Sequence, residues 1–119
     1  MSRSRLFSRP GASLTTSAFY ILLSLSLQDR HGYDILKDVT LSSAGRVKVG
    51  PGTLYTTLKR LLDVGLIIEV EGRVDSERDD SRRRYYRLTG QGRAELAAEL
   101  ERMEHALKLA RTRRARPAQ

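Results

Sequence analysis

The alternation of apolar and polar positions predicts a mainly α protein with a small β wing. Positions 15–27 are apolar on most sides, as in a helix enclosed by a core, and a second helix is expected over 33–41. A third helix is expected over 51–64, strands over 66–70 and 83–88, and a last helix from Thr89, a suitable N-cap, to about Ala110. Two strands directly after a helix pair predict a winged helix-turn-helix followed by one C-terminal helix.

The segment 50–67, GPGTLYTTLKRLLDVGLI, carries the clearest functional pattern. Pro51 suits a first helical position, and Gly65 suits the left-handed residue beyond a helix end. Leu54, Leu58 and Leu61 fall at i, i+4 and i+7, which places them on one buried side. The hydroxyls and cations left on or near the outer side are Thr53, Thr56, Thr57, Lys59 and Arg60. Because such groups meet phosphates and base edges, we expect a DNA recognition helix here.

The charge of the chain favours an anionic partner. Residues 1–9 and 108–119 together hold eight basic residues and no acid, which equals the whole net charge of +8. Between these ends two windows, 39–62 and 81–94, contain no acid. The predicted DNA contacts are Lys48, Thr53, Tyr55, Thr56, Lys59, Arg60, Arg82, Arg83 and Arg84.

Several of these residues have an alternative structural role. Tyr55 faces away from the buried stripe and suits a phosphate contact, although it could pack beneath the wing. Lys59 could reach DNA or stay solvated. Side chains alternate along a strand, so only part of the arginine run can touch DNA at once, and one of Tyr85 and Tyr86 belongs to the core. His31, beside a glycine, is interpreted as a turn residue.

The last predicted helix contains a heptad stripe. Leu96, Leu100, Met103, Leu107 and Ala110 are spaced 4, 3, 4 and 3 residues apart. The stripe could pack on its own domain, but a small domain gains from sharing apolar surface, so we expect a homodimer. The predicted dimer interface comprises Phe19, Tyr20, Leu96, Leu100, Met103 and Leu107.

Four motifs in register resemble the PadR family of transcriptional regulators, of the short kind with one C-terminal helix. They are GYDILKDV at 32–39, PGTLYTTLKRL at 51–61, VGLI at 64–67 and RRRYYRLTGQG at 82–92. The resemblance implies a homodimer that binds an operator, usually as a repressor, with the third helix in the major groove and the wing at the backbone or minor groove. It also implies that the C-terminal helix exchanges contacts with the partner.

The chain departs from the family pattern at three places. Thr56 stands where the family commonly has proline. The wing tip at 74–84, VDSERDDSRRR, puts four acids before the arginine run, which is expected to weaken phosphate attraction. Gly90 and Gly92 stand where the family often has acids, so the first turn of the last helix is expected to fray.

A small aromatic effector is a further hypothesis. Some members of the family hold flat aromatic drugs between tryptophans at the dimer centre, but this chain has no Trp, so that mode cannot be copied. Large side chains would instead converge if the first and last helices pair across a dimer. The expected pocket is lined by Phe19, Tyr20, Met103 and Leu107.

The composition argues against several other classes of protein. With no cysteine and two distant histidines we expect no metal site and no cofactor. The longest apolar stretch, 14–27, is shorter than the roughly 20 residues of a membrane span, so we expect a cytoplasmic protein without a membrane partner. We expect no signal peptide, because the start is rich in arginine and lacks a cleavage site. No nucleophile and base pair or phosphate loop predicts an enzyme.

The pattern therefore predicts a flexible basic arm over 1–13, a DNA-binding domain over 14–88, a dimerisation helix over 89–110 and a disordered basic tail over 111–119. The expected function is a dimeric repressor that binds a pseudo-palindromic double-stranded operator and is released by a small ligand. Two alternatives remain: a basic protein that binds nucleic acid without sequence preference, and a protein-interaction module on a winged-helix scaffold.

Overall fold

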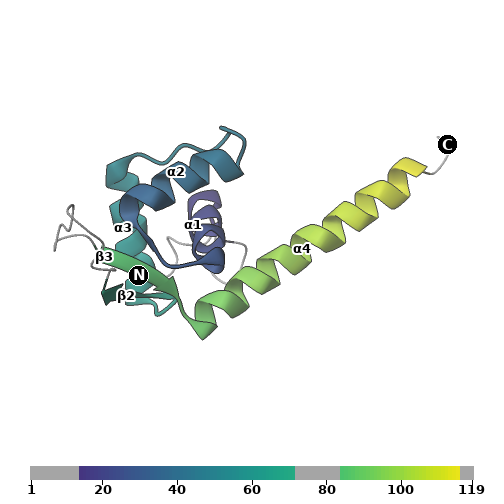
Figure 1. Ribbon diagram of the computed structural model, residues 1–119. Helices are drawn as coiled ribbons and strands as arrows, with labels where there is room; N and C mark the ends of the chain where they lie inside the picture. Colours follow the sequence, from purple (N-terminus) through teal and green to yellow (C-terminus); the bar gives the residue numbers. More distant parts are fainter. Residues whose placement is uncertain (1–13, 72–83, 116–119) are drawn as a thin grey trace.

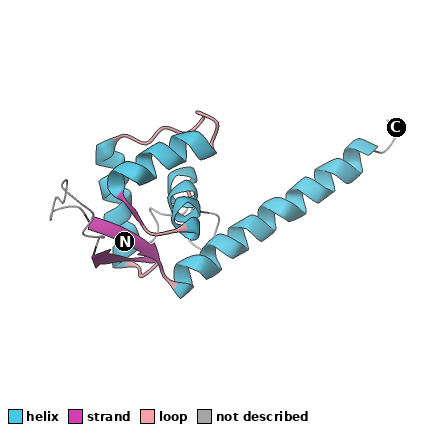
Figure 2. Cartoon of the chain, viewed as in Figure 1, coloured by secondary structure: helices cyan, strands magenta, loops and turns pink. Residues whose placement is uncertain are grey.

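The computed structural model describes residues 14–71 and 84–115, and these form a winged helix-turn-helix with a long C-terminal helix (Figures 1 and 2). The elements in order are α1 (Thr16–Leu27), β1 (Arg30–His31), α2 (Gly32–Ser42), α3 (Pro51–Asp63), β2 (Ile67–Glu71), β3 (Arg84–Leu88) and α4 (Gly90–Ala115). The predicted fold class is confirmed. The predicted arm over 1–13 and the wing tip lie outside the described residues.

The described strands form an antiparallel sheet in the order β1-β3-β2. In β2 and β3, Ile67 pairs with Leu88 and Glu71 with Arg84. The sequence did not predict β1, in which Arg30 pairs with Tyr86 and His31 with Tyr85. Two residues are too few to show an alternating pattern, so this strand depends on its partner rather than on its own sequence.

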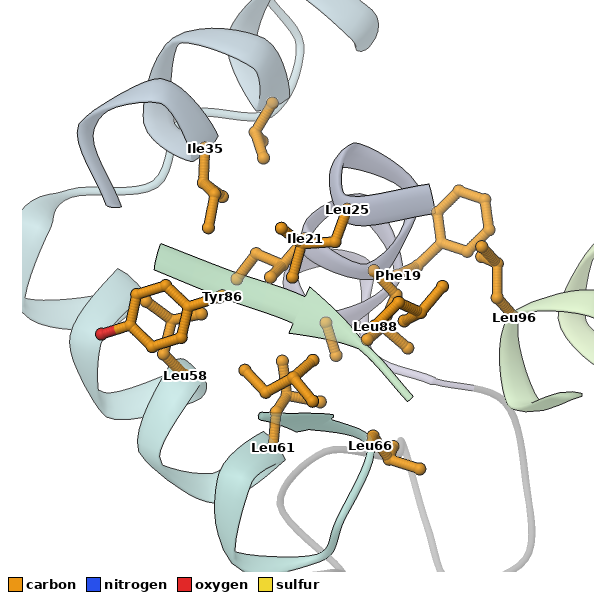
Figure 3. Close-up of a cluster of buried hydrophobic side chains, with 14 of the residues drawn as sticks. Phe19, Ile21, Leu25, Ile35, Leu58, Leu61, Leu66, Tyr86, Leu88 and Leu96 are labelled. Atoms are coloured by element: carbon orange, nitrogen blue, oxygen red, sulfur yellow. The ribbon is translucent and has the colours of Figure 1, made fainter. Parts of the chain in front are cut away.

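The hydrophobic core lies between α1, the inner sides of α2 and α3, and the sheet (Figure 3). Leu54, Leu58 and Leu61 are at most 1% exposed, which confirms the predicted stripe of α3. In β3 the side chain of Tyr86 is buried and that of Tyr85 is half-buried, as the alternation of a strand requires.

Short polar contacts fix where the helices begin and end. Thr15 caps α1 by accepting the backbone N–H of Ala18 at 3.3 Å. Pro51 lies in the first turn of α3, and Gly65 beyond its end has φ +81°, the left-handed conformation that glycine adopts without strain. Both predictions are confirmed.

Thr89 joins the end of α3 to the start of α4. Its Oγ1 accepts the N–H of Gly92 at 3.0 Å and donates to the carbonyl of Gly65 at 2.7 Å. The predicted N-cap is confirmed, and α4 begins at Gly90, so both glycines lie within its capped first turn.

Gly92 is required by close packing. A Cβ atom at this position would lie 2.0 Å from the carbonyl oxygen of Leu66 and 2.8 Å from Cδ1 of Leu88. The start of α4 therefore rests directly on the backbone that leads into β2.

The predicted end of the last helix, near Ala110, was wrong. Helix α4 continues to Ala115, so residues 111–115 are helical and do not belong to a disordered tail. Alanine, leucine and arginine are good helix formers, and arginines in the last turn interact favourably with the helix dipole. Within the described ranges, no helix is both long and apolar enough to cross a membrane.

We expect Gly92→Ala to lower the free energy of unfolding by about 1–3 kcal/mol, the usual effect of an extra methyl group in a filled site. The clash involves backbone, so side-chain rotation cannot relieve it. Gly90→Ala is the matched control, because nothing lies within 4 Å of its added Cβ. Denaturant unfolding at one protein concentration measures both variants, and equal stability of the two would contradict this account.

Candidate nucleic-acid interface

Helix α3 presents an exposed polar side opposite its buried stripe. Thr53, Thr56 and Lys59 are exposed, and Arg60 is half-buried. Thr57 was predicted to lie on or near the outer side of the helix. This prediction was wrong, because Thr57 is only 7% exposed. Three residues after Leu54 and next to Leu58, its side chain falls within the buried arc of the helix. The face available for contacts is therefore narrower than the sequence predicted.

Tyr55 lies against the beginning of α2. A Cβ atom on Gly32 would be 2.5 Å from the Tyr55 hydroxyl oxygen, so the ring occupies the space left by this glycine. The tyrosine is nevertheless 53% exposed. It therefore contacts the start of α2 as well as solvent.

Helix α2 adds residues that were not among the predicted DNA contacts. Tyr33 is 63% exposed, and the Nζ atom of Lys37 lies 5.2 Å from the centre of its ring. An open hollow between α2 and the loop before α3 brings Lys37 and Lys48 to one surface; its lining is Leu36, Lys37, Thr40, Leu41, Lys48 and Val49. The sequence predicted Lys37 only as a polar position of a helix. It does not show that the loop carrying Lys48 packs beside this residue.

The carboxylates of α2 lie beside the two side chains of β1. Asp34 Oδ2 lies 3.1 Å from His31 Nε2, and Asp38 lies 3.9 Å from Arg30. His31, interpreted from sequence as a turn residue, is a buried N-cap whose Nδ1 accepts the N–H of Asp34 at 3.3 Å. The guanidinium of Arg30 offsets part of the negative charge that Asp38 adds near the lysines.

The described part of the wing is less basic than its sequence suggests. Arg84 is exposed and lies 3.4 Å from Glu69 on β2, while Arg82 and Arg83 are outside the described residues. Arg87 donates hydrogen bonds from Nε and Nη2 to the carboxylate of Asp29, and the shortest is 2.8 Å long. The hydrogen bond and the negative charge of Asp29 raise the pKa of the Arg87 guanidinium.

The two tyrosines of β3 stabilise the sheet beside the interface. Tyr85 meets the ring of His31 edge to face at 5.4 Å. Burial raises the pKa of the Tyr86 hydroxyl, and the charge of Glu69 raises it further. Tyr86 thus belongs to the core, while Tyr85 packs on His31 and keeps part of its surface exposed.

The residues predicted for a dimer interface divide into two groups. Phe19 and Leu96 are 6% and 4% exposed and lie side by side in the core of the single chain (Figure 3), so they are not free surface. Tyr20 is half-buried and meets Phe19 edge to face at 5.1 Å.

The rest of the heptad stripe lies on the part of α4 that leaves the body of the domain (Figure 1). Leu100, Met103 and Leu107 are 41–46% exposed there. Leu96 therefore packs on its own domain, as one alternative held. Among the described residues, no apolar side chain covers Leu100, Met103 and Leu107. The predicted pocket residues Met103 and Leu107 stand on this exposed segment, apart from the buried Phe19.

In the described parts of the chain, no cluster of three or more acidic or histidine side chains could hold a metal ion. Helix α3 holds no acid on its exposed side from Pro51 to Leu62; Asp63 is its last residue. Such a helix, held by a second helix and followed by a two-stranded wing, defines a winged-helix DNA-binding regulator.

Comparison with known proteins specifies the family. The model of the transcriptional regulator PadR-like family matches residues 21–98, so the chain belongs to that family of DNA-binding transcriptional regulators. A similar protein is "Uncharacterized protein X" of Lysinibacillus sphaericus, 33% identical over 78 residues, which cover 65% of this chain and 69% of that one.

Solved structures agree with this assignment. A PadR family transcription regulator from Clostridium difficile R20291 is 26% identical, with a TM-score of 0.68, over 82% of this chain and 97% of that chain. A PadR-like transcription factor from Bacteroides fragilis is 32% identical, with a TM-score of 0.59, over 82% and 87% of the two chains.

Proposed function

We propose that the protein is a cytoplasmic, dimeric repressor that acts by binding a pseudo-palindromic operator, not by catalysing a reaction. The observation that carries this proposal is the exposed side of α3, which holds no acid from Pro51 to Leu62, above a fully buried leucine stripe. A helix held in this way can enter the major groove, which is about 12 Å wide.

The first turns of α3 supply the base contacts in this proposal. Thr53, Thr56 and Lys59 offer hydroxyl and ammonium groups to base edges. Tyr55, Lys37 and Lys48 flank them and supply phosphate contacts, because phosphate contacts fix the orientation of a recognition helix. Arg60, Arg84 and the undescribed Arg82 and Arg83 complete the predicted set.

Dimerisation through α4 accounts for its uncovered apolar stripe. The stretch from Leu100 to Ala115 is exposed throughout and would extend about 24 Å as a helix. Leu100, Met103 and Leu107 lie on one side of it, so a partner helix would remove them from water. In a single copy these side chains stay in water and contribute no burial free energy to the stability of the fold.

The charges of α4 favour an antiparallel pair. Residues 90–104 contain four glutamates and two arginines, whereas residues 105–115 contain four basic residues and no acid. An antiparallel arrangement brings the acidic half of each helix beside the basic half of the other. A parallel arrangement would place the two basic halves together.

The base-reading role of α3 predicts the effect of Lys59→Ala. Binding to the best operator should weaken by about 1–3 kcal/mol and base preference should relax at one position. Arg93→Ala removes another exposed cation, on the first turn of α4, and serves as the control for charge alone. Fluorescence anisotropy at constant salt with operator and single-base variants measures both. Unchanged affinity and preference in Lys59→Ala would contradict the role of this lysine.

The antiparallel pairing predicts a crosslinking pattern, which is readily tested because the chain has no cysteine. Leu100→Cys and Leu107→Cys variants, refolded together, should form a disulfide between the two different chains on oxidation. Each variant alone should not, because its two cysteines lie too far apart along the pair for a disulfide. Efficient disulfide formation by either single variant alone would instead indicate a parallel pair.

Release by a small aromatic effector is proposed at the same interface. Tyr20 is half-buried beside Phe19, and Met103 and Leu107 of a paired helix could close an apolar pocket over it. Isothermal titration with phenolic acids and aromatic antibiotics tests this proposal. Heat of binding that is lost in Met103→Ala, together with weaker operator binding, is expected; no heat with any compound and unchanged DNA binding would overturn it.

A further inference from the structure

Glu99 is a buried carboxylate at the place where α4 leaves the body of the domain. Its side chain is 7% exposed, whereas every residue of α4 after it is exposed. None of the predicted DNA, dimer or effector contacts uses this residue. A charged group in such a position is costly unless partners compensate its lost hydration.

Two partners hold the carboxylate of Glu99. Its Oε1 accepts the backbone N–H of Leu14 at 3.1 Å and a hydrogen bond from Arg102 Nη2 at 2.6 Å. Leu14 is itself 6% exposed and belongs to the core. The contact therefore links the segment before α1 to α4, across 85 positions of sequence.

This hydrogen bond supplies a constraint that the neighbouring apolar contacts do not. Phe19 and Leu96 hold α4 against α1 by burial, which has little directional preference. A hydrogen bond from a fixed backbone N–H to a carboxylate prefers a narrow range of angles. Glu99 lies at the base of an arm about 24 Å long, so a tilt of about 10° there moves the far end by about 4 Å.

We propose that Glu99 is a positioning residue that fixes the direction of α4 relative to the DNA-binding domain. If α4 pairs two chains, as the proposed function holds, that direction sets the distance between the two recognition helices. A displacement of about 4 Å corresponds to roughly one base-pair step of 3.4 Å. Glu99 then determines how strictly the dimer selects the spacing between operator half-sites.

The first test measures the direction of the arm without DNA. Spin labels are attached to cysteines introduced at Ser42 and His105, both exposed, and labelled protein is diluted with unlabelled protein so that only distances within one chain are recorded. Glu99→Gln keeps an oxygen acceptor for the N–H of Leu14, whereas Glu99→Met fills a similar volume without one. Glu101→Met removes an exposed carboxylate two positions away and is the control.

We expect one narrow distance distribution for the labelled protein that keeps Glu99, for Glu99→Gln and for Glu101→Met. Glu99→Met should broaden it about twofold or displace its maximum by several Å, while circular dichroism and the melting transition show a folded protein. An unchanged distribution in folded Glu99→Met would overturn the positioning role, because apolar packing would then suffice to direct the arm.

The second test selects operators from a pool with randomised half-sites and randomised spacing. We expect Glu99→Met to accept spacings one or two base pairs away from the preferred one, with unchanged base preference within each half-site, and Glu99→Gln to keep the original spacing. Strict spacing in Glu99→Met would overturn the link to half-site selection. Failure of the unmodified protein to enrich any inverted repeat would refute the proposed function instead, and the distance measurement would still decide the role of Glu99.

Discussion

The approach of Gly92 to the carbonyl of Leu66 is the contact on which the arrangement of this molecule depends. It brings the start of α4 onto the backbone between α3 and β2. The same place is joined by Thr89, whose N–H donates to Leu66 O at 3.1 Å and whose hydroxyl donates to Gly65. Helix α3, the wing and the C-terminal arm thus meet within a few residues, at a place with no room for a side chain.

This junction connects the two halves of the proposed function. The buried stripe of α3 holds the helix on the core while its outer side stays free for DNA, and its end is fixed to the base of α4. Phe19 and Leu96 extend this attachment to α1, and Glu99 extends it to Leu14 just before α1, so the start of the arm is attached to the domain at several points. A dimer assembled through the arms would therefore hold two recognition helices at a defined separation.

The sequence predicted the features that repeat along the chain and missed those that depend on one distant contact. The leucine stripe of α3, the glycine after it and the cap at Thr89 were confirmed, because local spacing and residue type determine them. The two-residue strand β1, the burial of Thr57 and the close packing of Gly92 required knowledge of the neighbouring backbone. Lys37 and Glu99 had no local pattern that distinguished them from ordinary polar helix positions, and the roles predicted for the DNA contacts stay predictions.

The most direct test of the central claim is selection of bound duplexes from a random DNA pool at near-physiological salt, with the size of the bound complex measured in parallel. Such salt matters because phosphate contacts alone give binding that falls steeply as salt rises. We expect enrichment of one inverted repeat, bound by two copies of the chain. A pool that binds without enrichment of any sequence would contradict it, since the basic residues would then attract DNA by charge alone.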